Sequence, residues 1–135
     1  TAESFRKDGF FITGDMAVRD ADGYISIVGR DKDLIITGGL NVYPREVESL
    51  VDEVAGVQES AVIGVPHPDF GEAVVAIVAA GPDAVSADAV IEALAGKLAK
   101  FKQPKSVHLV DALPRNSMGK VQKATLRDEY AGLFA

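Results

Sequence analysis

A run of apolar residues in the middle of the chain limits the folds open to it most strongly. Residues 73–80 read Ala-Val-Val-Ala-Ile-Val-Ala-Ala, and Gly81 and Pro82 follow them directly. A strand with apolar side chains on both faces is usually covered on both faces. We therefore expect this strand inside a sheet against which helices pack, and the 135 residues are enough for one domain with such a core.

The segments around this strand alternate between strand-like and helix-like patterns. Further strands are predicted at residues 34–37, 57–65 and 105–110, because β-branched residues dominate there. A helix is predicted from Pro44 to Gly56, since its apolar residues recur at spacings of three and four. The Gly38-Gly39 pair is expected to open a flexible loop that runs through residue 43.

Two more helices are predicted in the second half of the chain. Ser86 can cap a helix that runs to about Lys100, with Leu98 and Phe101 on its apolar stripe. A last helix follows residue 120, with one apolar face formed by Leu126, Tyr130, Leu133 and Phe134. The predicted order after residue 33 is β-α-β-β-α-β-α, which indicates an α+β fold with a small sheet covered by helices.

The first 30 residues have a different character. Residues 10–18 and 24–28 are predicted as two strands of a β-hairpin, joined by a turn at residues 20–23. Because an isolated hairpin is only marginally stable, we expect it to belong to a larger sheet outside this chain. Residues 29–33 carry four charges and no apolar side chain, which is typical of a linker or hinge.

Charge is distributed unevenly along the chain. The formal net charge is −6, but residues 1–96 carry −11 and residues 97–127 carry +7. The basic part is a candidate anion site, or alternatively a solvated helix face and strand edge. Nucleic acid is not expected as a partner, because no aromatic residues alternate with the lysines. The chain has no cysteine, no apolar run of about 20 residues and no secretory signal, so we expect a soluble cytoplasmic protein without a membrane span.

One basic residue stands in a loop suited to ligand binding. Residues 114–119 read Pro-Arg-Asn-Ser-Met-Gly, and Lys120 follows immediately. Gly119 lacks a side chain, so the backbone there can approach a ligand closely, and Lys120 offers a mobile charge to an anion. The alternative interpretation is a basic surface turn in front of a helix.

Three segments together resemble one enzyme superfamily. They are Thr13-Gly14-Asp15, residues 29–48 from Gly-Arg-Asp-Lys-Asp to Arg-Glu-Val-Glu, and residues 114–120. Their sequence, order and spacing resemble the last three signature motifs of the acyl-CoA synthetases, peptide-synthetase adenylation domains and luciferases. The chain as a whole looks most like malonyl-CoA synthetases and related synthetases of short-chain acids.

The resemblance implies a reaction in two steps. A carboxylate first attacks the α-phosphate of ATP, which gives an acyl-adenylate and pyrophosphate, and the thiol of coenzyme A then displaces AMP. Asp15 and Arg30 would bind the ribose of ATP. Lys120 would be the catalytic residue of the first step, bridging the carboxylate and the oxygens of ATP.

The second step is implied to need a rotation of the small domain. Lys32 matches the hinge position, where other members often carry Asp. After the rotation, Gly38, Gly39 and Leu40 would line the tunnel for the pantetheine arm. Lys102, with Lys100 and Lys105, would meet the phosphates of coenzyme A.

By the same resemblance, the chain is one part of a larger enzyme. Residues 1–31 would be the tail of the large N-terminal domain, and residues 32–135 the small mobile C-terminal domain. The phosphate loop, the ligands of Mg²⁺ and the pocket for the carboxylic acid are missing, so this chain alone cannot complete the reaction. Lys120 would also be a target for a lysine acetyltransferase and a deacetylase, and acetylation would remove its charge.

Two alternatives remain open. Within the superfamily, the chain could come from an adenylation module that loads a carrier protein, or from a luciferase-like oxygenase. In another class, it would be a non-catalytic interaction domain whose basic face docks an acidic partner. In that case Lys120→Ala should act no differently from Lys123→Ala.

Overall fold

The computed structural model describes residues 15–19, 25–30 and 33–135, and only the backbone of the first two ranges. Strands β1 (Asp15–Arg19) and β2 (Ile25–Arg30) pair antiparallel, with Asp15 opposite Arg30. The predicted hairpin is therefore confirmed in these residues. Its turn and residues 10–14 of its predicted first strand lie outside the described residues.

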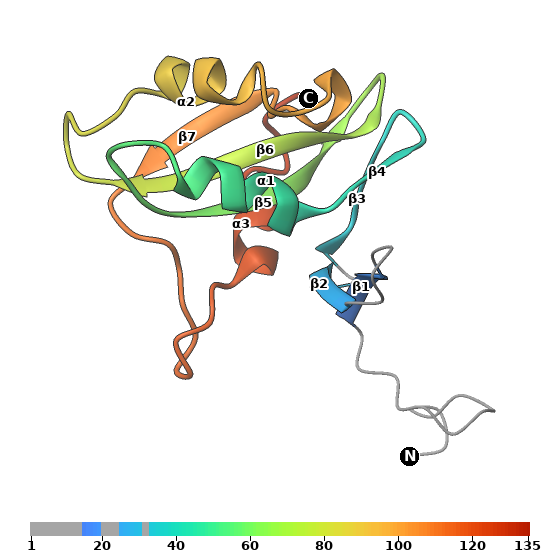
Figure 1. Cartoon of the computed structure of the whole chain (residues 1–135), viewed down its shortest axis with the longest axis horizontal. Helices are drawn as coiled ribbons and strands as arrows, with labels where there is room; N and C mark the ends of the chain where they lie inside the picture. Colours follow the sequence, from blue (N-terminus) through green and yellow to red (C-terminus); the bar gives the residue numbers. More distant parts are fainter. Residues whose placement is uncertain (1–14, 20–24, 31–32) are drawn as a thin grey trace.

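A five-stranded mixed sheet forms the body of the molecule (Figure 1). Its strands are β3 (Ile35–Thr37), β4 (Leu40–Val42), β5 (Val57–His67), β6 (Gly71–Ala80) and β7 (Ser106–Val110). Strand β6 is central: β5 and β3 pair with it antiparallel, and β7 pairs with it in parallel. The apolar segment that constrains the fold is thus surrounded by other strands.

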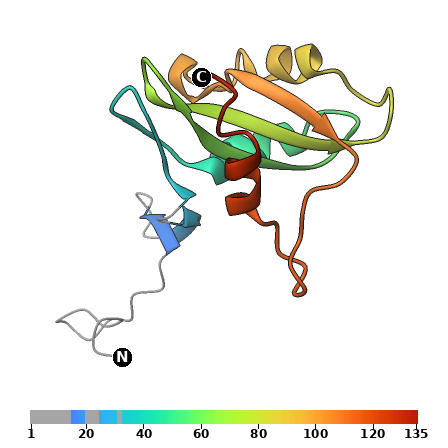
Figure 2. The same ribbon diagram turned by 180° about the vertical axis from the view of Figure 1, so that it is seen from behind.

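Helices cover both faces of this sheet, as predicted. Helices α1 (Pro44–Asp52) and α2 (Ala87–Leu94) lie on one face, and α3 (Lys123–Glu129) lies on the other (Figures 1 and 2). Alternate residues of β6 enter the two cores, Val74, Ala76 and Val78 under α1 and α2, and Val75, Ile77 and Ala79 under α3. All six are at most 1% exposed, which explains why the strand has no polar face.

The loop predicted at residues 38–43 is wrong for residues 40–42. These residues form β4, which pairs with β3 so that Thr37 faces Leu40. Gly38 and Gly39 have φ values of 57° and 81°, and two such residues in a row make the tight turn of a β-hairpin. The two glycines are therefore the turn between two strands, and the strand after them buries Val42 completely.

The second helix is shorter than predicted. Helix α2 begins after Ser86, whose hydroxyl accepts a hydrogen bond from Ala89 N–H as expected, but it ends at Leu94 instead of about Lys100. The side-chain amide of Gln103 donates to the carbonyls of Ala95 and Leu98, which satisfies carbonyls beyond the helix end. A short 3₁₀ turn follows at Lys100–Lys102, and Phe101 is 37% exposed, so it does not belong to the apolar stripe.

The last helix also ends earlier than its apolar pattern suggests. Helix α3 stops at Glu129, and Leu133 is exposed in the turn that follows. Leu126 is buried, and Tyr130 and Phe134 pack against the same core. Burial raises the pKa of the Tyr130 hydroxyl, with the charge of Glu129 as a second cause, so this side chain stays neutral beside the core.

Candidate functional site

Lys120 lies on a short hairpin loop that projects from the body of the molecule (Figures 1 and 2). Arg115 and Val121 form an isolated antiparallel bridge at its base. Across the loop, Asn116 N–H donates to the Lys120 carbonyl at 2.9 Å, and Gly119 N–H donates to the Asn116 carbonyl at 3.0 Å. Gly119 has a φ of 81°, a conformation that favours glycine. The glycine in front of Lys120 is thus required by the turn.

Two side chains hold this loop in shape. The Oδ1 atom of Asn116 accepts hydrogen bonds from Met118 N–H at 2.9 Å and from Lys120 N–H at 3.0 Å. The guanidinium of Arg115 donates to the Gly119 carbonyl at 2.6 Å and pairs with Glu59 on β5. The backbone of Lys120 is therefore fixed from inside the loop, while its side chain remains exposed.

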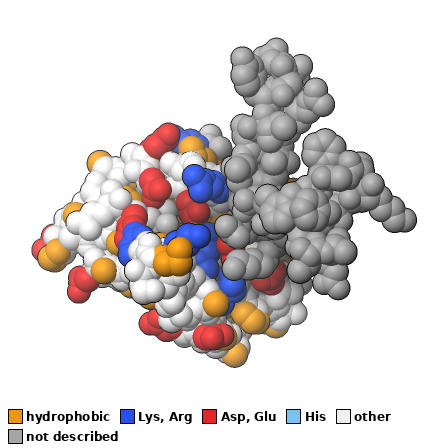
Figure 3. All heavy atoms as spheres, turned by 90° about the horizontal axis from the view of Figure 1, so that it is seen from below, with side chains coloured by type: hydrophobic (Ala, Val, Ile, Leu, Met, Phe, Trp, Pro, Cys, Tyr) orange, Lys and Arg blue, Asp and Glu red, His pale blue; other side chains and the backbone are white. Residues whose placement is uncertain are grey.

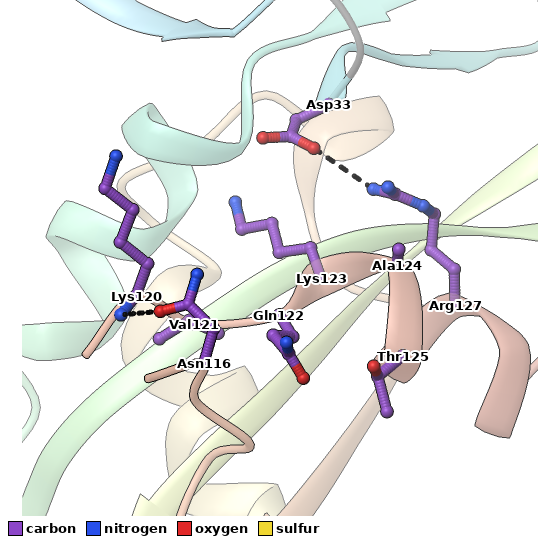
Figure 4. A pocket seen from close by; sticks show the side chains of 9 residues that line it. All are labelled: Asp33, Asn116, Lys120, Val121, Gln122, Lys123, Ala124, Thr125 and Arg127. Atoms are coloured by element: carbon purple, nitrogen blue, oxygen red, sulfur yellow. Dashed lines mark hydrogen bonds and ion pairs between the residues drawn. The ribbon is translucent and has the colours of Figure 1, made fainter. Parts of the chain in front are cut away.

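A hollow of about 400 Å³ lies between this loop, α3 and Asp33 (Figure 4). Lys120, Lys123 and Arg127 line it, and their side chains extend to the same side of the chain (Figure 4). On the molecular face that carries the loop, Lys and Arg side chains gather near the middle, among Asp and Glu side chains (Figure 3). The hollow thus brings together three cations from eight consecutive residues.

Two of these three cations are paired with carboxylates. Lys123 Nζ lies 2.8 Å from Glu48 Oε2, and Arg127 Nη1 lies 3.2 Å from Asp33 Oδ1. Within the described part of the chain, the amine of Lys120 makes no ion pair. Lys120 is therefore the cation of this hollow best able to meet an external anion.

The two ion pairs also fasten α3 to distant parts of the domain. Glu48 belongs to α1, and its carboxylate accepts a second hydrogen bond from Val62 N–H on β5 at 2.9 Å. Asp33 precedes β3 and is only 16% exposed at its side chain. Helix α3 is thus anchored at both ends, which fixes the loop in front of it relative to the start of β3.

A second group of candidate residues lies around the Gly38-Gly39 turn. Gly38 N–H donates to the Phe70 carbonyl at 2.9 Å. The ammonium of Lys105 lies 4.7 Å from the centre of the Phe70 ring, which is 37% exposed. Lys102 instead pairs with Glu46 of α1 at 3.0 Å. The turn, an exposed ring and one lysine therefore form a continuous surface, whereas Lys102 is held by α1.

The structure brings two groups of predicted site residues together. Gly38, Gly39 and Leu40 form one turn and the start of one strand, and Asp15 and Arg30 face each other across β1 and β2. The predicted hinge residue Lys32 lies outside the described residues. In the described ranges there is no group of three or more His, Cys, Asp or Glu side chains that could hold a metal, and no helix long and apolar enough to cross a bilayer.

Sequence reasoning missed the residues that position the site. Asn116 was identified as a loop former, but its bonds to two backbone amides were not predicted. The sequence places Asp33 in a charged linker and Glu48 near the start of a helix, but it does not predict that they pair with residues 94 and 75 positions away. Such partners leave no local pattern, so only their charge could have drawn attention to them.

Comparison with known proteins identifies what this chain is similar to. The family model described as the AMP-binding enzyme C-terminal domain matches residues 46–120. The chain is 46% identical over 124 residues to the long-chain-fatty-acid–CoA ligase FadD13 of Mycobacterium tuberculosis. It is 48% identical over 130 residues to a Rhodococcus jostii CoA ligase of a methyl-dioxo-octahydroindenyl propanoate. These matches cover 92% and 96% of this chain but a quarter of each relative.

Solved structures of similar proteins cover all or nearly all of this chain. ATP-bound MatB from Rhodopseudomonas palustris is 56% identical with a TM-score of 0.91, and the match covers all of this chain and 27% of that one. The apo form of MatB gives 57% identity and a TM-score of 0.83. A Mycobacterium tuberculosis fatty acyl CoA synthetase gives 44% identity and a TM-score of 0.79, over 98% of this chain and 26% of that one.

Proposed function

This chain belongs to the family of AMP-binding enzyme C-terminal domains, and from this premise we propose that it is the small catalytic domain of an AMP-forming acyl-CoA synthetase. The complete enzyme would join a carboxylic acid to coenzyme A and convert ATP to AMP and pyrophosphate. An acyl-adenylate would be the intermediate. The relatives over the full length of this domain are named as CoA ligases, which supports this reaction class.

The observation that carries the proposal is the way the chain presents Lys120. Its backbone is held by Asn116 and Gly119, its side chain is exposed, and the neighbouring cations are paired with carboxylates. Formation of an acyl-adenylate brings two anions together, the carboxylate and the α-phosphate. A fixed cation at the developing charge lowers that barrier, and the loss of one such group typically costs about 10²–10³-fold in rate. Lys120 would fill this role.

The nucleotide would be held by residues from the start of the chain as well. Asp15 would accept hydrogen bonds from the ribose hydroxyls, and Arg30 would reach the same ribose. Their positions opposite each other in the β1–β2 register support a shared ligand. Lys32 would be the hinge between residues 1–31, which would belong to the large N-terminal domain, and the mobile domain of residues 32–135.

The surface around the Gly38-Gly39 turn would serve the second step. Two residues without side chains, followed by Leu40, leave room for the pantetheine arm at the turn. The exposed Phe70 ring and Lys105 beside it offer stacking and charge to the nucleotide end of coenzyme A. Lys102 would contribute to the same phosphates, in competition with its ion pair to Glu46.

We propose a malonate-like or other short-chain acid as the substrate. Among the solved structures, the chain is more similar to MatB, at 56%, than to the Mycobacterium tuberculosis fatty acyl CoA synthetase, at 44%. The acid pocket and the Mg²⁺ ligands would lie in the N-terminal domain. Such an enzyme would act in the cytoplasm, and acetylation of Lys120, reversed by a deacetylase, would switch off its first step.

Assays of the complete enzyme with a panel of acids test this function. Malonate, acetate, an aromatic acid and a long-chain fatty acid would each be supplied with ATP and Mg²⁺. We expect acid-dependent exchange of pyrophosphate into ATP with one short-chain acid, and a thioester when coenzyme A is added. Exchange without transfer to coenzyme A, but with transfer to a carrier-protein thiol, would indicate a carrier-loading module instead. Absence of exchange with every acid would favour a non-catalytic interaction domain.

A further inference from the structure

The β3–β4 hairpin, which carries Gly38 and Gly39, is joined to the main sheet by few backbone contacts. β3 pairs with β6 only through Thr37 and Gly71, whereas β5 pairs with β6 from Val57 to His67. The bond from Gly38 N–H to the Phe70 carbonyl lies directly beside this single pair. These two backbone contacts are adjacent, so the angle of the hairpin to the sheet also depends on side-chain contacts, and Ile35 and Val42 supply some of them in the core under α1 and α2.

The side chain of Glu72 supplies a further contact, close to the turn. One residue further along the two strands, Ile36 comes opposite Glu72, and a continuing antiparallel ladder would bond the Ile36 amide to a carbonyl of β6. The register contains no such pair. Ile36 N–H donates instead to Glu72 Oε1 at 3.1 Å. The carboxylate therefore bridges the two strands at the point where they diverge.

Gly64 provides the space for this carboxylate. A Cβ at Gly64 would overlap with Glu72 Oε2 and would lie 3.0 Å from its Cδ and 3.2 Å from Ile35 Cγ1. Gly64 is not among the described glycines with positive φ, so its backbone conformation does not require glycine. Glycine inside a strand weakens the strand and often marks a close approach. Here the approaching group is the Glu72 side chain.

We propose that Glu72 is a positioning residue for the step in which coenzyme A reacts. It holds the Gly38-Gly39 turn at one angle to β6 and so sets the path of the pantetheine arm past that turn. The assignment rests on the proposed function, in which this turn lines that path. Because a misplacement of about 1 Å can cost about 10²-fold in rate, the contact matters for reaction with the thiol and not for formation of the adenylate.

The test uses the complete enzyme and separates the two half-reactions. Glu72→Ala, Glu72→Gln and the control Glu92→Ala, an exposed glutamate of α2, are compared with the wild type. Acid-dependent pyrophosphate exchange reports the first step, and thioester formation from supplied acyl-adenylate and coenzyme A reports the second. For Glu72→Ala we expect kcat/KM for coenzyme A to fall about 10–100-fold, with exchange unchanged. Glu72→Gln keeps an acceptor oxygen and should recover most of the loss.

Gly64→Ala provides an independent check. Its Cβ would displace the carboxylate, so it should lower the same kcat/KM, and the double variant with Glu72→Ala should lose no more than the larger single loss. Amide hydrogen exchange in a peptide that covers residues 34–43 should be faster in Glu72→Ala than in Glu72→Gln. This measurement reports the stability of the β3–β4 hairpin even when activity is low.

Three results would overturn the assignment while the proposed function stands. They are equal losses in both half-reactions, a Glu72→Ala enzyme that matches Glu92→Ala, and additive losses in the double variant. A wild-type enzyme that forms no thioester from any acid would contradict the proposed function and this assignment with it.

Discussion

Single residues with unusual conformations and contacts shape the candidate site. Gly119 is the clearest case, because it has a φ of 81° and no atom lies within 4 Å of the place where its Cβ would be. Backbone conformation, and not lack of space, therefore disfavours a side chain at this position. The next residue is Lys120, so a change of the turn would move the cation on which the proposed chemistry depends.

Gly119→Ala should weaken the first half-reaction. The left-handed conformation costs an ordinary residue about 1–2 kcal/mol, so the loop would relax and move Lys120. We expect pyrophosphate exchange to fall about tenfold, which corresponds to about 1.4 kcal/mol. Gly119→Asn is the matched variant, because asparagine tolerates this conformation, and it should lose clearly less. Equal activity of both variants and the wild type would mean that the turn does not position Lys120.

Lys123→Ala should destabilise the domain. Lys123 and Glu48 are each 17% exposed, and removal of the lysine leaves a largely buried carboxylate with only the Val62 amide as partner. We expect a loss of about 1–3 kcal/mol, seen as a lower midpoint of thermal unfolding. The double variant Glu48→Gln with Lys123→Met should recover part of it, because neither charge is then stranded. An unchanged midpoint in Lys123→Ala would show that the pair contributes nothing.

Because Lys123 is largely buried, Lys123→Ala is a poor control for Lys120→Ala in a test of the interaction-domain alternative. Under that alternative, Lys123→Ala would serve as the control for Lys120→Ala, but Lys123 is held between α3 and α1. Lys97, which is exposed, is the better control. A loss in Lys123→Ala would reflect folding as much as function.

At the scale of elements, α3 connects the Lys120 loop to the start of β3. Its Arg127 pairs with Asp33, the first described residue after the proposed hinge. A rotation about Lys32 would carry the whole domain, including Asp33, α3 and Lys120. Within the domain, this ion pair holds α3, and with it the loop in front of the helix, against the start of β3.

Arg127→Ala should therefore slow the first half-reaction although Arg127 need not touch the substrate. We expect exchange to fall about tenfold, or about 1.4 kcal/mol in the barrier. Arg127→Lys should recover part of it, and Arg127→Ala combined with Asp33→Asn should be no worse than Arg127→Ala alone. Additive losses in the double variant would show that Arg127 and Asp33 act independently, which would contradict a role for their ion pair.

The elements that sequence predicted well are those with strong local patterns. Residues 73–80 are apolar on both faces, and β6 extends them by only two residues at its start. Helix α1 begins at Pro44 as its helical spacing predicts, but it ends at Asp52, before Gly56. β4 was missed because three residues after a glycine pair carry no periodic signal. The end of α2 was predicted too late because Leu98 keeps the helical spacing. The feature that accompanies the end is a distant one, since the Gln103 side chain donates to the carbonyls of Ala95 and Leu98.

For the whole molecule, the predicted superfamily and fold class are confirmed, and the residue roles stay predictions. The motifs around Asp15, Gly38 and Lys120 pointed to the family, and residues 46–120 match its C-terminal domain. The contacts around the Gly38-Gly39 turn and the Lys120 loop come from Glu72, Asp33 and Glu48, whose partners are far away in the sequence. A motif can therefore locate the reacting groups, whereas the supporting contacts emerge only from the fold.

In the proposed mechanism, this domain supplies Lys120 to the first step and its Gly38-Gly39 surface to the second. The two regions lie on different elements, the loop before α3 and the β3–β4 turn. One enzyme would present them in turn by rotation of the domain about Lys32. A single substitution should then affect one half-reaction and spare the other.

The most direct measurement is made on the complete enzyme with Lys120→Ala, beside Lys97→Ala as the control. Acid-dependent pyrophosphate exchange and thioester formation from supplied acyl-adenylate are assayed separately. We expect exchange to fall about 10²–10³-fold in Lys120→Ala, with thioester formation and the Lys97→Ala enzyme unchanged. If Lys120→Ala retained both half-reactions, Lys120 would be an ordinary surface lysine and the proposed mechanism would be wrong.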